Sequence, residues 1–142
     1  MGLSKTLKVL TCVIEQSLDD ICRISDERII QDLLASKMKA KNLHFTKRTV
    51  IKSEIYPDME IDLIETCKEN GVAIEVKVNP RFYEGVGQAI MLKELYGRKA
   101  VLLQVYDEVS ERVINALRVA SCRTGIKVIL VSKKGKWVKV IP

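Results

Sequence analysis

Two carboxylates and one lysine have a spacing that can bring them together on one face of a β-hairpin. Asp62 lies in the run I-D-L-I, and Glu75 and Lys77 follow in V-A-I-E-V-K-V. Both runs have the composition of short strands, and the Asn70-Gly71 dipeptide between them is a strong hairpin signal. Alternate side chains of a strand point to opposite faces, so Glu75 and Lys77 share a face.

The length of the hairpin loop decides which residues face each other, and two registers are open. A two-residue loop at Asn70-Gly71 pairs Ile64 with Lys77, whereas a four-residue loop pairs Asp62 with Lys77. Either register places Asp62, Glu75 and Lys77 on one face, within roughly 5–8 Å of each other. Two carboxylates and water can hold Mg²⁺, and a nearby lysine can orient water or neutralise a phosphate. The alternative is a solvated hairpin face with an ordinary ion pair.

The rest of the chain predicts an α/β fold with a mixed sheet. Apolar residues recur every three or four positions over 3–21 and 29–34, which indicates two N-terminal helices, the second with Ser25 as its N-cap. The first three predicted strands form an antiparallel meander, and the later elements alternate as in a parallel βαβ unit. The predicted strands are 44–55, 61–66, 72–78, 100–106, 126–131 and a short 137–141. The predicted later helices are 84–96 and 110–123.

The length of 142 residues fits a single domain. We divide it into an N-terminal helical extension (1–24), a core (25–132) and a basic C-terminal strand or tail (133–142). Four separated cysteines and one histidine argue against a zinc site and fit free thiols in a reducing compartment. No run is long and apolar enough to span a bilayer, and the N-terminus lacks a secretory signal. We therefore expect a cytoplasmic protein that does not bind membranes.

The net charge of +6 is unevenly distributed along the chain. Residues 37–52 hold six basic side chains and no acidic one, and 123–142 hold six more, whereas 54–75 contain seven carboxylates and one lysine. Basic surface attracts nucleic acid, and clustered carboxylates attract divalent cations, although solvated faces are the alternative. The residues that we expect to contact nucleic acid are Lys47, Arg48, Lys52, Lys133, Lys134 and Lys136.

The motif I-D-L-I-E-T-C-K-E-N-G-V-A-I-E-V-K-V and the order of elements resemble the PD-(D/E)xK, or restriction-endonuclease-like, nuclease superfamily. The resemblance spans about residues 26–132, and the pattern is nearest to archaeal Holliday-junction-resolvase-like and RecB-type members. It implies a restriction-endonuclease-like core, with Asp62 as the metal-binding aspartate of the motif. Asp58 or Glu60 takes that place if the strand register differs.

The resemblance also implies roles for two residues outside the hairpin. Related nucleases often carry a metal-facing glutamate on the first core helix, a place that Glu27 occupies, with a helix-dipole role as the alternative. They also often carry a glutamine on the helix after the motif, which matches Gln88. Tyr96 departs from the common RecB-type spacing and receives no role.

On this resemblance we expect a Mg²⁺- or Mn²⁺-dependent endonuclease that hydrolyses phosphodiester bonds in DNA. Lys77 would position the attacking water and Gln88 would hold Lys77. One alternative is a Holliday-junction resolvase, which needs a homodimer, and another is a non-catalytic nucleic-acid-binding or assembly module on the same fold. The expected metal ligands are Glu27, Asp62, Glu75 and the carbonyl of Val76.

Overall fold

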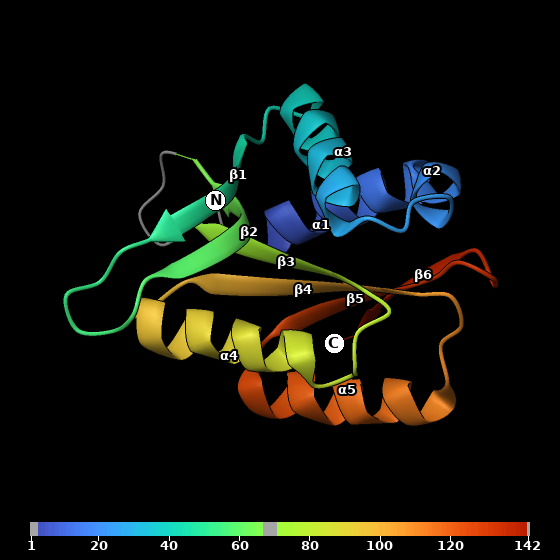
Figure 1. Cartoon of the computed structure of the whole chain (residues 1–142). Coiled ribbons are helices and arrows are strands. Elements are labelled where there is room, and N and C mark those ends of the chain that lie inside the picture. The colour runs from blue at the N-terminus through green and yellow to red at the C-terminus, as the bar shows by residue number, and fades with distance from the viewer. Residues whose placement is uncertain (1–2, 67–70, 142) are drawn as a thin grey trace.

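A computed structural model of the chain, which describes residues 3–66 and 71–141, forms a six-stranded sheet with helices on both faces (Figure 1). The strands lie side by side in the order in which they follow one another along the chain. The expected α/β fold with a mixed sheet is confirmed. The strands are β1 (Phe45–Ile51), β2 (Met59–Glu65), β3 (Val72–Val78), β4 (Lys99–Tyr106), β5 (Lys127–Ser132) and β6 (Trp137–Ile141).

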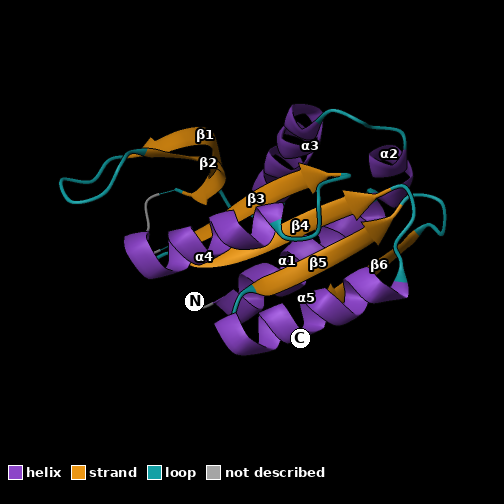
Figure 2. Ribbon diagram, turned by 60° about the horizontal axis from the view of Figure 1, so that its bottom comes forward, coloured by secondary structure: helices purple, strands orange, loops and turns teal. Residues whose placement is uncertain are grey.

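The sheet combines the predicted meander with the predicted parallel unit. Strands β1, β2 and β3 pair antiparallel, β3, β4 and β5 pair parallel, and β6 runs antiparallel to β5. Figure 2 shows β1 and β2 set off to one side of the three parallel strands. The parallel strands are covered by helices on both faces, which explains why β4 and β5 read as nearly continuous apolar runs.

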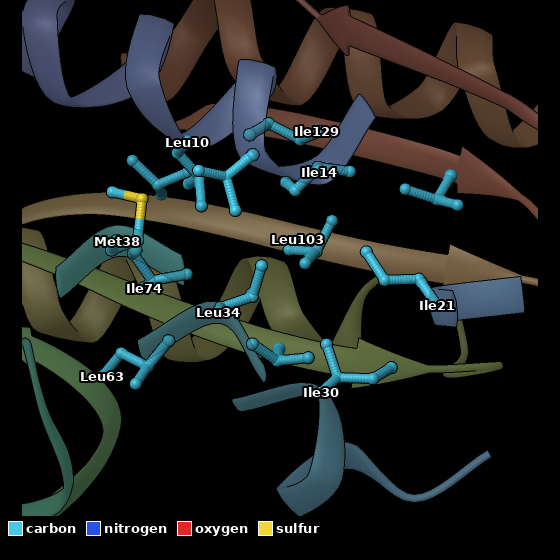
Figure 3. Close-up of a cluster of buried hydrophobic side chains, with 14 of the residues drawn as sticks. Leu10, Ile14, Ile21, Ile30, Leu34, Met38, Leu63, Ile74, Leu103 and Ile129 are labelled. Atoms are coloured by element: carbon cyan, nitrogen blue, oxygen red, sulfur yellow. The ribbon is translucent and has the colours of Figure 1, made fainter. Parts of the chain in front are cut away.

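Helices cover both faces of the sheet, with a separate apolar core under each layer (Figure 1). The first layer holds α1 (Leu3–Gln16), α2 (Leu18–Cys22) and α3 (Glu27–Ala40), and the second holds α4 (Glu84–Tyr96) and α5 (Glu111–Thr124). In Figure 3, Leu10 and Ile14 of α1 meet Leu103 and Ile129 of the sheet. Because α1 fills this core and β6 pairs with β5, residues 3–24 and 133–141 pack into the same body as the core.

Two details of the N-terminal helices differ from the prediction. The helix is interrupted at Ser17, between α1 and α2. The apolar periodicity nevertheless continues through Leu18 and Ile21, and no glycine or proline marks the interruption. The N-cap of α3 is Asp26, whose side chain accepts a hydrogen bond from the N–H of Arg28 at 2.9 Å. The prediction of Ser25 was wrong because serine and aspartate are equally good caps. No helix within 3–66 and 71–141 has the length and apolar character needed to cross a membrane.

Both hairpin registers predicted from the sequence are wrong. Leu63 pairs with Ile74 and Ile64 with Ala73, so β2 is shifted by two residues from the nearer prediction. The Asn-Gly signal favours a short loop, but the pairing implies a longer connection, part of which lies outside the described residues. A shift by an even number of residues keeps every side chain on its face. The register therefore brings Asp62 close to Glu75, one residue beyond the last backbone pair of the ladder.

Candidate active site

The candidate site lies where β2 separates from β3. The ladder between these strands ends at Leu63 and Ile74, and beyond it side chains replace backbone pairing. Asp62 Oδ2 accepts a hydrogen bond from the N–H of Val76 at 2.8 Å, and the N–H of Asp62 donates to Glu75 Oε1 at 3.4 Å. Both carboxylates are therefore held by backbone groups of the opposite strand.

Strand β2 also loses its regular alternation at Asp62. Ile61 packs into the core under α4 and α5, as Ile64 does, whereas Leu63 packs into the core under α1 and α3. A regular strand would place Ile61 and Leu63 on one face. The irregularity lets the Asp62 side chain turn into the gap between the strands instead of standing on a sheet face.

Glu75 is almost completely buried, with 2% of its surface exposed. Burial raises the pKa of Glu75 to about 8, with further contributions from the negative charge of Asp62 and from a side-chain hydrogen bond with it. The hydrogen bond from the Asp62 N–H and the charge of Lys77 oppose this rise only in part. Two carboxyl groups that lie this close cannot both ionise easily. The Glu75 carboxyl group is therefore mostly protonated at neutral pH.

Lys77 follows Glu75 on the same face of β3, and its side chain is half-buried. Its charge lies close enough to Glu75 to favour ionisation of that carboxyl group. Within 3–66 and 71–141, no hydrogen bond or ion pair satisfies the Lys77 ammonium group. The ammonium group is therefore free to interact with a substrate or a water molecule beside the carboxylate pair.

Helix α4 closes this face of the sheet, and Gly85 allows its close approach. A Cβ atom at Gly85 would lie 2.4 Å from Cδ1 of Leu102, the residue that pairs with Glu75. Gln88 lies one turn further along α4, and its Oε1 is buried with no hydrogen-bond partner among the described residues. Its predicted contact with Lys77 is not formed as a hydrogen bond, and its role stays a prediction.

Glu27, the first residue of α3, is bound to the end of β3. Its Oε2 accepts a hydrogen bond from the N–H of Val78 at 2.9 Å. In the part of the chain that the structure describes, no three His, Cys, Asp or Glu side chains gather closely enough to hold a metal ion. The structure therefore unites Asp62 and Glu75 but does not add Glu27 as a third carboxylate. The roles of Glu27 and of the Val76 carbonyl as ligands stay predictions.

The structure distinguishes among the three acidic residues that were open as the partner of Glu75. Asp58 is exposed in the connection before β2, and Glu60 is exposed opposite Val50 of β1. Asp62 alone of the three bonds to β3. The choice of Asp62 from its strand position therefore agrees with the geometry.

Most of the basic residues expected to bind nucleic acid pair with acidic neighbours. Lys133 has a structural contact as well, since its side chain is only 13% exposed and its Nζ donates to the carbonyl of Ile24 at 2.5 Å. Lys52 is exposed, and within the described ranges it has no partner. The ion pairs are Lys47–Asp32 (3.1 Å), Arg48–Asp32 (3.1 Å), Lys133–Asp107 (4.0 Å), Lys134–Glu108 (2.6 Å) and Lys136–Asp19 (3.8 Å).

Sequence reasoning missed Gln104, which lies beside Lys77 in the β3–β4 register. The run over 100–106 has the pattern of a buried apolar strand, and Gln104 is fully buried within it. A single amide in an otherwise apolar strand of A-V-L-L-Q-V-Y is the signal that could have found it. A buried polar side chain needs a partner, and the sequence offers no other reason for one there.

No protein-family model matches the chain, and no curated protein matches it. Among solved structures, the chain is similar to SfsA from Pyrococcus furiosus, which was determined in complex with Ca²⁺, with a TM-score of 0.44 and 13% identity. The alignment covers 79% of this chain and 62% of that protein, so the chain spans less than two thirds of its length. The resemblance to PD-(D/E)xK nucleases stays a prediction from the motif and the order of elements.

Proposed function

We propose that the chain is a metal-dependent nuclease that hydrolyses phosphodiester bonds in DNA, with Mg²⁺ or Mn²⁺ bound at Asp62 and Glu75. The observation that carries this proposal is the hydrogen-bonded pair of carboxyl groups beside Lys77, whose ammonium group has no partner within the described residues. If this were a solvated hairpin face with an ordinary ion pair, the carboxylates would be exposed and Lys77 would form an ion pair with one of them. Glu75 is instead buried, and its charge is suppressed by Asp62.

The donor set fits a hard divalent cation. Carboxylate oxygens are the ligands that Mg²⁺ and Mn²⁺ prefer, and one or two carboxylates with water are typical of a Mg²⁺ site. Burial and the negative charge of Asp62 raise the pKa of Glu75, and a bound cation would favour its ionised form. Glu27 and the Val76 carbonyl would complete the ligand set. When bound, such an ion polarises the phosphoryl oxygen and lowers the pKa of a bound water.

The other residues of the site would act on the substrate. Lys77 would hold the attacking water or a phosphate oxygen, where its charge stabilises the negative charge that develops in the transition state. Gln88 would orient Lys77 through its buried amide. Exposed basic residues such as Lys52, Lys134 and Lys136 would bind phosphates on either side of the cleaved bond. A homodimer would be needed if the substrate is a four-way junction.

The proposal is tested by incubating the pure protein with Mg²⁺ or Mn²⁺ and labelled linear duplex, single-stranded, flapped and four-way DNA. Glu75→Gln should abolish cleavage, whereas Glu60→Gln, which removes an exposed carboxylate from the neighbouring strand, should not. Symmetrical cutting of the four-way substrate alone would identify a resolvase. DNA binding without cleavage of any substrate would overturn the nuclease proposal in favour of the binding module.

A further inference from the structure

Gln104 is a fully buried amide that is only half satisfied. Its Nε2 donates to the hydroxyl of Tyr106 at 3.1 Å, but its Oε1 has no partner among the described residues. A buried amide oxygen without a hydrogen bond destabilises a fold, and an apolar side chain would fill this strand position without that cost. Gln104 therefore points to a hydrogen bond that the site forms with a nearby donor.

Lys77 is the donor that the sheet places beside Gln104. The two residues are partners in the parallel β3–β4 ladder, in which neighbouring strands lie about 4.8 Å apart and paired side chains share a face. An ammonium group has three donors and no acceptor. No acceptor within 3–66 and 71–141 is bonded to Lys77. A buried acceptor without a partner and a half-buried ammonium group with no acceptor among the described residues therefore occupy adjacent positions.

Helix α4 keeps water from satisfying the amide. A Cβ atom at Gly85 would lie 3.1 Å from Gln104 Oε1, so the backbone of α4 closes directly over this oxygen. Tyr106 fixes the other end of the amide, and its own burial raises its pKa to about 12, so its hydroxyl stays neutral at physiological pH. The amide is thus held in one orientation, with its oxygen directed to the protein interior.

We propose that Gln104 is a positioning residue for Lys77, with Oε1 accepting a hydrogen bond from the Lys77 ammonium group. This inference rests on the proposed function, because it assigns Gln104 to the site in which Lys77 acts. The chain of contacts from Tyr106 through Gln104 to Lys77 holds the ammonium group beside Glu75. The three donors of Lys77 leave room for Gln88 and for the substrate.

The contact itself can be tested without metal or DNA. The side-chain nitrogen of Lys77 can be observed by NMR and assigned through its loss in Lys77→Met. Gln104→Met removes the acceptor at nearly constant volume, and it should shift the Lys77 signal and accelerate exchange of its ammonium protons. Gln31→Met is the matched control, because Gln31 is also buried but bonds to Arg48. An unchanged Lys77 signal in Gln104→Met would overturn the proposal.

Tyr106→Phe provides a milder second variant that removes only one hydroxyl group. The amide then loses its fixed orientation, and we expect a smaller change of the Lys77 signal in the same direction. If Gln104→Met does not fold, this variant decides the question. A Lys77 signal identical to that of the wild type in Tyr106→Phe would then reject the contact.

Kinetics connect the contact to catalysis. Gln104→Met should lower kcat on the order of tenfold to a hundredfold through misplacement of Lys77, with KM nearly unchanged. Gln104→Glu retains an acceptor for the Lys77 ammonium group, so its kcat should be close to that of the wild type. In a Lys77→Met background, Gln104→Met should cause no further loss, whereas multiplying losses would contradict the proposal. If the NMR result holds but the wild type cleaves no DNA, the contact stands and the nuclease proposal fails.

Discussion

The N–H of Asp62 lies 3.4 Å from Glu75 Oε1, just beyond the last backbone pair of the β2–β3 ladder, where β2 leaves β3. The separation frees the Asp62 carboxylate from the sheet surface and turns it toward the backbone of β3. Burial of Glu75 and the charge of Asp62 then oppose ionisation of Glu75. The local geometry at which we propose a bound cation thus also makes ionisation of Glu75 unfavourable when no cation is present.

The first prediction concerns stability and pH in the metal-free protein. The pKa of Glu75 is raised from an ordinary 4.5 to about 8, so the folded state retains a proton that the unfolded state has lost. The free energy of unfolding should therefore fall as pH rises from 4.5 to 8, by at most about 1.4 kcal/mol per pH unit from this group. Glu75→Gln should remove this part of the slope, measured by urea unfolding in EDTA. Glu60→Gln should retain it, and equal slopes for Glu75→Gln and the wild type would contradict the assignment.

The second prediction concerns proton release on metal binding. A metal ligand must be deprotonated, so binding of Mn²⁺ at pH 7 should release up to about one proton from Glu75 and at pH 9 almost none. Calorimetry in buffers with different ionisation enthalpies measures this release. Metal at a hundredfold excess over its Kd should also raise the free energy of unfolding by about 2.7 kcal/mol. Heats of binding that are independent of the buffer at pH 7 would exclude Glu75 as a ligand.

The third prediction concerns the basic surface. Reversing the charges of Lys134 and Lys136, whose ion pairs are exposed, should weaken DNA binding and reduce the log–log salt slope by about one unit for each lost phosphate contact. Lys52→Glu should act in the same way. Lys133→Met should instead lower thermal stability, because its Nζ binds the carbonyl of Ile24. A salt slope unchanged by all three charge reversals would show that these lysines do not contact DNA.

The fourth prediction tests the close approach of α4 to the site. Gly85→Ala should destabilise the fold by about 1–3 kcal/mol, because the new Cβ would lie 2.4 Å from Leu102 Cδ1. Gly87→Ala is the matched control in the same helix, with no atom within 4 Å of its new Cβ. It should stabilise the helix by up to about 1 kcal/mol. Urea unfolding of both variants is the measurement, and equal effects would contradict the packing.

Sequence patterns predicted those parts of the fold that have local signals. The bounds of β3, α4 and β6 agree with the prediction, and Gly97 ends α4 in the left-handed conformation that glycine favours. The break at Ser17 could not be predicted, because apolar periodicity runs through it. The hairpin register was wrong because it depends on the packing of whole strands rather than on Asn70-Gly71.

The site could be predicted in part despite the wrong register. Strand parity places Glu75 and Lys77 on one face, and both predicted registers have the parity of the observed one, so Asp62 still lies close to Glu75. The side-chain bonds of Asp62 to β3 were not predictable, since they depend on the local irregularity of β2. Gln104 was missed because a single amide does not disturb the apolar pattern of its strand.

The central claim is that Asp62 and Glu75 bind a divalent cation, and that this cation and Lys77 together promote cleavage of DNA. Its most direct test is the rate of cleavage of labelled DNA under single-turnover conditions as a function of Mg²⁺ or Mn²⁺ concentration, compared between the wild type, Glu75→Gln and Lys77→Ala. We predict metal-dependent cleavage by the wild type and none by Glu75→Gln. For Lys77→Ala we predict an unchanged metal midpoint with a rate reduced about a hundredfold or more. Full cleavage by Glu75→Gln, or no metal-dependent cleavage by the wild type, would contradict the claim.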